Sequence, residues 1–497
     1  MHIQNQASVN RPWLPSGLVA LLCLAALGGC AVGPDFAAPT PAVPRAWIGS
    51  AISPASQPEN LAAWWTAFKD SELTSLVKQA LESNLDIRIA ASRIRQARAN
   101  RGIAMSGLGP SVDASGSFQR SKTSGGQLGG SQTSAGQPAA GTNLVTNQYQ
   151  AGFDAGWEID IFGGVRRGAE VADAQLLSAV EDRRDVQVTL AAEVAQNYIT
   201  LRASQQRLAI ARRNLAAQKH SAEVTRQKFE GGLVSRLDVA NADAQVATTT
   251  SQIPMLESSA RQTVYAMAAL LDREPGALVQ ELSAPAEVPA TPPAVPAGVP
   301  SDLLQRRPDI RRAEANIHSA TANIGVATAD LFPKVTIDGS LGWQSANAGS
   351  LFDPLSRFWS FGPSVTWNVF QSGKTLSNIE VQRAIQEQSL LTYRQTVLAA
   401  VQEVENALIA SAKEQEHRQS LADAVAANRL AVELATKLYA EGHTDFLNVL
   451  SAQQALLTSE DALVQSVAAI SLDFVALYKA LGGGWEDQPQ TTRMERK

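Results

Sequence analysis

Four segments of the chain alternate between apolar and polar residues with a period of two, and this pattern predicts β-strands. The expected strands cover about 110–120, 148–161, 334–344 and 358–370. In the second of them, Phe153 and Trp157 fall on one side of the pattern, whereas Asp154 and Glu158 fall on the other. Successive strand residues point to opposite faces, so each strand has one apolar and one polar face. Segments of about ten residues with this pattern are typical of strands that cross an outer membrane around a watery lumen.

Four strands are too few to close a barrel around a channel. Closure would therefore require several copies of the chain. The alternative is a pair of soluble hairpins with one buried face, which the strand pattern alone leaves open.

Most of the remaining sequence predicts very long helices. Residues 164–229 and 374–439 contain no proline, and about 65 helical residues would span ~100 Å. Apolar residues recur at spacings of three and four, as in a coiled-coil seam: Val186, Leu190, Val194, Tyr198 and Leu201. A returning helix is expected to end near Leu271 or Leu481, with a kink at Pro254 in the first.

The chain contains an internal duplication. Pro110 and its surroundings reappear at Pro333, 223 residues later, and Trp157 reappears at Trp367, 210 residues later. The offset shrinks because the Gly- and Ser-rich segment 121–147 is longer than its counterpart. The expected organisation is a signal peptide (1–29), an extended lipidated segment (30–71), a first repeat (72–283), a Pro-rich linker (284–300), a second repeat (301–481) and a polar tail (482–497).

The N-terminal region predicts export and lipidation. Arg11 precedes an apolar run over residues 14–27, which is short for a membrane span but fits a signal sequence. The run ends in LGGC, with Cys30 as its last residue, and this resembles a bacterial lipobox. Cys30 is then the expected site of the diacylglycerol, Cys23 leaves with the signal, and Ala31 in the next position resembles the outer-membrane sorting class. A core helix that happens to contain two cysteines is the alternative.

Composition excludes several classes of protein. The net charge is −5 with a pI near 5.7, so the basic surface of a nucleic-acid-binding protein is absent. Charged residues make up 18%, yet the mean hydropathy of −0.09 is too low for a polytopic helical membrane protein. The two cysteines cannot build a disulfide scaffold. His220, His318 and His417 have no partner at i+4 and are expected at solvated positions rather than around a metal.

Catalytic motifs are weak. Ser372-Gly373-Lys374-Thr375 follows a strand as a phosphate-binding loop does, but Asn368 stands where that loop requires its first glycine. A hydrolase would need a nucleophile with a base, and no such pair is visible. We therefore expect no enzyme activity.

Several motifs in fixed order resemble the TolC-like outer membrane factor family, in particular its lipoprotein branch, the NodT-type outer membrane efflux lipoproteins of tripartite RND-type pumps. The matching segments are Cys30-Ala31-Val32-Gly33-Pro34-Asp35-Phe36, Trp64-Trp65 with Phe68 and Asp70, Asn84-Leu85-Asp86-Ile87, Trp157-Glu158-Ile159-Asp160, Arg306-Arg307-Pro308-Asp309-Ile310 and Phe332-Pro333. Together they cover nearly the whole chain from Cys30 to Leu481.

The resemblance implies a mixed α and β membrane protein. It implies a homotrimer whose twelve strands, four per chain, form one transmembrane β-barrel, continuous with a long α-helical periplasmic barrel. It further implies an exit duct of a tripartite efflux system, lipid-anchored in the outer membrane and extending into the periplasm. The implied partners are a periplasmic adaptor and an inner-membrane efflux transporter, and the only bound group is the covalent lipid on Cys30.

The resemblance also assigns two helical turns to a periplasmic tip that contacts the adaptor and closes the pore. The assigned residues are Gly231, Gly232, Leu237, Asp238, Gly442, Thr444, Asp445, Leu447, Asn448 and Ser451. Leu447 matches a position that narrows the pore in the family. Relatives often carry acidic residues where this chain has Asn448 and Ser451, so the cation selectivity of the family is not carried over to the turn of the second repeat. The first repeat keeps Asp238. The alternative is that these residues only cap a helical hairpin.

A lipid-anchored periplasmic coiled-coil adaptor or scaffold is the second functional hypothesis. It would use the lipobox and the helical hairpins, but it has no need of four strands with one lipid-facing and one lumen-facing side.

Overall fold

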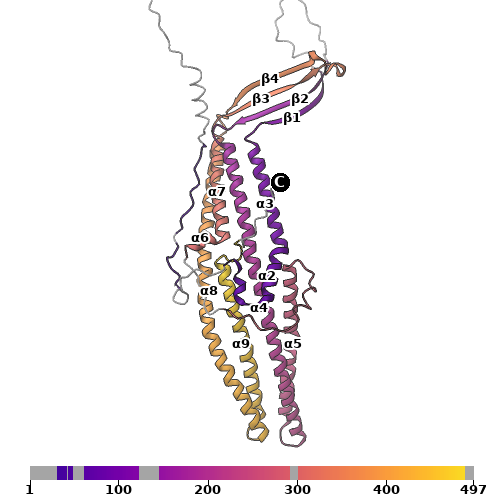
Figure 1. The fold of residues 1–497 in the computed structure, drawn as a ribbon, viewed down its shortest axis with the longest axis vertical. Helices are drawn as coiled ribbons and strands as arrows, with labels where there is room; N and C mark the ends of the chain where they lie inside the picture. The colour runs from indigo at the N-terminus through magenta and orange to yellow at the C-terminus, as the bar shows by residue number, and fades with distance from the viewer. Residues whose placement is uncertain (1–30, 42, 49–60, 123–144, 292–299, 487–497) are drawn as a thin grey trace, which may run out of the picture. The chain divides into compact units, whose positions relative to one another are not determined.

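The computed structural model describes residues 31–41, 43–48, 61–122, 145–291 and 300–486 (Figure 1). It divides into two compact units. Unit 1 comprises residues 1–38, 96–176 and 316–389, and unit 2 comprises residues 39–95, 177–315 and 390–497. The predicted lipidation site, Cys30, lies outside the described residues.

The order of elements repeats along the chain, as the internal duplication predicts. The elements are η2 (Leu61–Phe68), α2 (Ser71–Ser83), α3 (Leu85–Ser106), β1 (Ser111–Lys122), β2 (Val145–Ile159), α4 (Gly164–Glu230), α5 (Arg236–Leu270), α6 (Asp302–Arg306), α7 (Pro308–Ala329), β3 (Lys334–Ser345), η4 (Ala348–Ser350), η5 (Pro354–Ser356), β4 (Arg357–Thr366), α8 (Lys374–Glu441) and α9 (Phe446–Ala480). Each half therefore has a helical pair, a strand pair, a very long helix and a returning helix.

Unit 1 contains one antiparallel sheet with the strand order β1-β2-β3-β4. β2 pairs with β3 and so joins the strands of the two repeats. β1 and β4 are the edges of this sheet, and each has an unpaired side within the chain. Unpaired strand edges offer backbone donors and acceptors to another strand.

The register sorts the side chains into an apolar and a polar face. Phe118 lies opposite Tyr149 with ring centroids 4.6 Å apart, and Ala151 lies opposite Trp343 on the same face. We call this side the apolar face and the other the polar face. The polar face carries the carboxylates of the four strands: Asp113, Asp154, Glu158 and Asp338. The alternation expected from the sequence is thus expressed as two chemically different surfaces.

A pair of glycines brings β2 and β3 close together. Gly152 lies opposite Gly342. A Cβ on Gly342 would lie 2.5 Å from the carbonyl oxygen of Ala151 and 2.8 Å from the Cα of Gly152. Since both are backbone atoms, a side chain at Gly342 would force the strands apart.

β4 ends at Thr366, before the expected limit near residue 370. Its ladder stops there because Thr366 pairs with Lys334, the first residue of β3. Beyond this point, the Trp367 indole N–H donates to the carbonyl of Leu331 at 3.0 Å. Trp157 makes the equivalent bond at 3.0 Å in the first repeat, so the two halves use the same anchor.

The long helices have the extent that the proline-free segments predicted. α4 contains 67 residues and α8 contains 68. α5 continues through Pro254 as one helix, and the expected kink at this residue stays a prediction. Among the helices of the described segments, α9 is long and apolar enough to span a membrane. Its apolar residues also pack within unit 2, where the Phe474 ring lies 5.0 Å from that of Phe68.

A buried polar network holds α2 against α4 in unit 2. Arg202 is almost fully buried and pairs with Glu72. It also donates to the carbonyl of Ala284 at 2.8 Å. The Tyr198 hydroxyl donates to Asp70 at 2.8 Å, and burial raises the pKa of this phenol. Each charge therefore has a partner, as burial requires.

Asp473 on α9 predicts a pH-dependent stability. Burial, followed by the charge of Glu414, raises its pKa to about 6. Because this carboxyl binds its proton more tightly in the folded chain than in the unfolded chain, its contribution to stability is fully present below the pKa of the unfolded chain. The contribution is lost as the pH rises through about 6. Asp473→Asn should therefore raise the apparent melting temperature by about 2 °C at pH 8 and change it little at pH 5. Melting curves at the two pH values test this, and an equal shift at both would contradict it.

Candidate functional site

Two helical turns in unit 2 end the long helices in the same way. Gly232 has φ 73° after α4, and Gly442 has φ 80° after α8. The Leu233 N–H donates to the carbonyl of Lys228 at 2.8 Å, and His443 makes the equivalent 2.8 Å bond five positions back. This geometry satisfies carbonyls that the helix end leaves free, and it favours glycine because the backbone is left-handed.

An apolar cluster joins the four helices at these turns. Its buried members come from α4, α5, α8 and α9: Ala222, Ala242, Tyr439, Phe446 and Val449. The Tyr439 and Phe446 rings lie 5.5 Å apart. The two hairpins are therefore packed against each other within one chain.

Lys228 on α4 bonds to the last carbonyls of α8. Its ammonium donates to the carbonyl of Tyr439 and, at 3.4 Å, to that of Ala440. It also lies 4.2 Å from the centroid of the Tyr439 ring. The Tyr439 hydroxyl donates to Thr225 at 3.2 Å. A cation beside the last carbonyls of a helix stabilises that helix end.

The two returning helices begin differently. On α5, Ser235 and Asp238 form a capping box, in which the Asp238 carboxylate accepts the Ser235 N–H at 2.9 Å. On α9, Asp445 is the N-cap residue but makes no capping bond with its side chain. Asn448 instead donates to the Thr444 hydroxyl at 2.7 Å. Asp238 thus serves as a helix cap, the role that the sequence also allows for the residues of these turns.

All the residues assigned to the tip lie in these turns or in the first two turns of the returning helices: Gly231, Gly232, Leu237, Asp238, Gly442, Thr444, Asp445, Leu447, Asn448 and Ser451. Leu237 and Leu447 are 67% and 61% exposed in the single chain. Apolar side chains exposed in this way are available to a partner or a second copy.

Sequence reasoning missed the role of Lys228. A signal was present, because Leu438 occupies the equivalent place in the second repeat. A lysine in one repeat where the other repeat has leucine indicates that this side chain has a polar partner in the first repeat only.

The segment after the predicted lipid site packs against the rest of unit 1. The Val32 N–H donates to the carbonyl of Phe162 at 3.1 Å. The buried Arg167 pairs with Asp35 and Glu170, each at 2.7 Å. This fixes residues 32–35 beside the joint between β2 and α4.

His318 differs from its expected solvated position. Its Nε2 lies 2.9 Å from the Glu170 carboxylate, and its ring stacks on Phe36 with centroids 4.4 Å apart. The side chain is half-buried because α7 packs here against the N-terminal segment. His417 is exposed and lies 3.0 Å from Glu414. Among the described residues, no group of three or more potential ligands could hold a metal ion.

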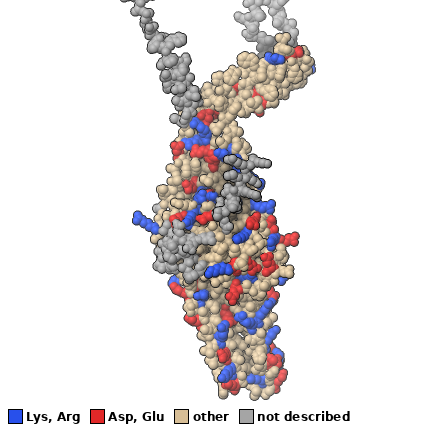
Figure 2. Space-filling model, viewed as in Figure 1, with Lys and Arg blue, Asp and Glu red and all other residues tan. Residues whose placement is uncertain are grey.

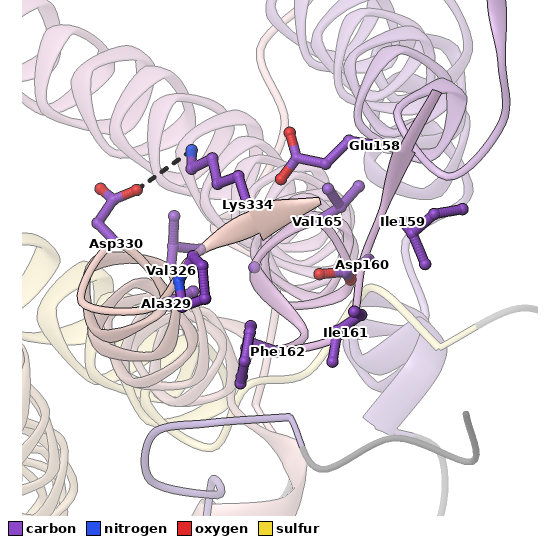
Figure 3. Close-up of a pocket in the computed structure, with 12 residues that line it drawn as sticks. Glu158, Ile159, Asp160, Ile161, Phe162, Val165, Val326, Ala329, Asp330 and Lys334 are labelled. Atoms are coloured by element: carbon purple, nitrogen blue, oxygen red, sulfur yellow. Dashed lines mark ion pairs between the residues drawn. The ribbon is translucent and has the colours of Figure 1, made fainter. Parts of the chain in front are cut away.

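A pocket of about 200 Å³ lies at the strand–helix joint of unit 1 (Figure 3). Glu158 and Lys334 lie at it, and Lys334 pairs with Asp330 at 3.3 Å. Phe162, which also lines it, stacks on Phe332 with centroids 4.6 Å apart. The residues that line the pocket include no serine, threonine, cysteine or histidine of the kind that a hydrolase uses as nucleophile or base.

Comparison with known proteins decides the family. The sequence profile of the family described as "Outer membrane efflux protein" matches residues 76–273 and 299–483. The chain belongs to this family. The two matched segments correspond to the two repeats.

Curated relatives of the family are similar over nearly their whole length. Nodulation protein T of Rhizobium leguminosarum bv. trifolii is 32% identical over 92% of this chain and 95% of its own. The antibiotic efflux pump outer membrane protein ArpC of Pseudomonas putida is 34% identical over 93% of this chain and 94% of its own. The solved structure of the outer-membrane channel OprN is 37% identical with a TM-score of 0.83, covering 92% of this chain and all of the other.

These findings confirm the functional class expected from the motifs. This outer membrane efflux protein is an exit duct in the outer membrane, and its family consists of channels rather than enzymes. The adaptor and hydrolase hypotheses are thereby excluded.

Proposed function

We propose that the outer membrane efflux protein forms a homotrimer with one twelve-stranded transmembrane barrel. The observation that carries this is the open sheet, since β1 and β4 each leave one edge unpaired in the single chain. Pairing β1 of one copy with β4 of the next closes the sheet and removes both edges. The apolar face then meets lipid and the polar face lines the lumen. The long helices continue the duct as a periplasmic barrel.

The duct passes small molecules delivered by an inner-membrane transporter through a periplasmic adaptor. The turns between α4 and α5 and between α8 and α9 are the adaptor contact and the gate. The exposed Leu237 and Leu447 support this role, because exposed apolar side chains suit a docking surface or a constriction.

Conductance of the purified protein tests the proposal. Full-length protein in planar bilayers should give discrete single channels, whereas a protein that only scaffolds a complex would give none. The absence of channels from correctly assembled protein would reject the duct.

The N-terminus carries a separate prediction. The contacts of residues 32–35 with Phe162 and Arg167 inside unit 1 suit a lipid held on the preceding Cys30. Intact mass should show a chain beginning at Cys30 with covalent lipid. An unmodified Cys30, or a chain beginning at Met1, would contradict lipidation. Cys30→Ser should leave some protein in the outer membrane because the strands also anchor it.

The gate prediction concerns Leu447. If three copies of Leu447 form the narrowest ring, then closure is steric and apolar, since Asn448 and Ser451 carry no charge. Leu447→Ala should raise single-channel conductance about twofold or more, and Ser451→Asp should increase cation selectivity. Ser115→Ala on the polar face of β1 is the control and should change conductance little. Unchanged conductance in Leu447→Ala would place the constriction elsewhere.

A further inference from the structure

The apolar face of the sheet carries positive charge only at its loop end, the end that lies away from the helices along the chain. Arg120 and Lys122 are the last residues of this face on β1, and Arg357 is the first on β4. All three are exposed. Figure 2 shows basic side chains at this end of the sheet.

These charges lie just beyond the aromatic part of the face. Arg120 and Lys122 follow Phe118 by two and four residues, which is ~7 and ~13 Å along a strand. Arg357 precedes Trp359, whose side chain is 77% exposed. Aromatic residues mark the membrane interface, so the three cations lie at the depth of lipid headgroups.

No carboxylate on this face neutralises them. Among the described residues, the structure gives Arg120, Lys122 and Arg357 no ion pair. The acidic residues of the strands lie on the polar face. The β1–β2 connection, residues 123–144, has no charged residue in its sequence, and the β3–β4 connection has one, Asp353.

The three basic residues lie on β1 and β4, the two edge strands that must pair between copies when the protein assembles. β1 and β4 are opposite edges of the sheet in one chain, whereas the inner pair β2–β3 has only uncharged residues at this end, including Asn147 and Ser345. In the trimer of the proposed function, on which this inference rests, Arg120 and Lys122 of one copy stand beside Arg357 of the next. Paired strands are ~4.8 Å apart.

We infer that each of the three seams binds the phosphate groups of a phosphorylated glycolipid of the outer leaflet. Arginine and lysine bind phosphate through charge-assisted hydrogen bonds, and the adjacent aromatic and apolar residues accommodate its acyl chains. The absence of basic residues from the other end of the same face, among the strands described, matches a membrane whose phosphorylated glycolipid is confined to one leaflet.

Native mass spectrometry of the full-length protein with purified bisphosphorylated lipid A tests this. Lipid A should remain bound to the assembled wild type. The combined variant Arg120→Gln, Lys122→Gln and Arg357→Gln should bind it roughly a hundredfold more weakly, as expected for three basic residues near a charged surface. Lys334→Gln, which removes a cation from the polar face, is the matched control and should bind normally.

Further arms identify the ligand. Lipid A without its phosphates should bind the wild type as weakly as intact lipid A binds the triple variant. A variant that keeps the charges, Arg120→Lys with Arg357→Lys, should retain binding of intact lipid A. Unchanged affinity in the triple variant would overturn the inference while leaving the duct intact. Full competition by millimolar inorganic phosphate would overturn the lipid assignment. If the same spectra show single chains, both the seam and the proposed trimer are rejected.

Discussion

Gly342→Val should reduce the yield of assembled protein by at least about tenfold. The Cβ of the new side chain would lie 2.5 Å from the carbonyl oxygen of Ala151 and 2.8 Å from the Cα of Gly152. Neither backbone atom can move without opening the β2–β3 ladder, which is the junction between the two repeats. Overpacking of this kind costs about 1–3 kcal/mol or more, and here it falls on the ladder that joins the two strand pairs of one chain into a single sheet. Size-exclusion chromatography of detergent extracts measures the assembled fraction.

Gly362→Val provides the matched control. Gly362 lies on the same polar face, in β4, and a Cβ there would meet no atom within 4 Å in the chain. This variant should assemble like the wild type. Equal assembly of both variants would show that the close approach of β2 and β3 is not required.

Arg307→Met should destabilise unit 2 by about 3–5 kcal/mol, because it removes one partner of a buried ion-pair network. Arg307 is 8% exposed and pairs with Asp309 and Glu403, each at 2.7 Å. It also donates to the carbonyl of Ala480 at 2.8 Å. One guanidinium thus ties the start of α7 to α8 and to the end of α9.

Thermal unfolding followed by circular dichroism measures the effect of Arg307→Met. Arg383→Met is the control, since Arg383 forms only an exposed pair with Glu380 at 3.6 Å and should change the melting temperature little. A melting temperature of Arg307→Met equal to that of the control would show that the network contributes nothing to stability.

The long elements could be predicted because their signals are repeated many times along the chain. The period-two pattern predicted the strands, and the absence of proline predicted α4 and α8. The end of β4 could not be predicted in this way. Trp367 continues the alternation, but the ladder ends where β3 supplies no further partner.

Contacts between distant residues left little trace in the sequence. The docking of Asp35 on Arg167 joins residues 132 positions apart, and His318 is half-buried because Phe36 and Glu170 converge on it. Side-chain type and spacing do not encode such convergence. Gly232 and Gly442 could be recognised as turn residues because they occupy equivalent positions in the two repeats.

Light scattering combined with refractive index gives the protein mass of the detergent-solubilised complex and tests the central claim most directly. Because two sheet edges per chain are open, the account predicts the mass of three chains in a single species. A monodisperse monomer would contradict it, since one four-stranded sheet cannot enclose a lumen.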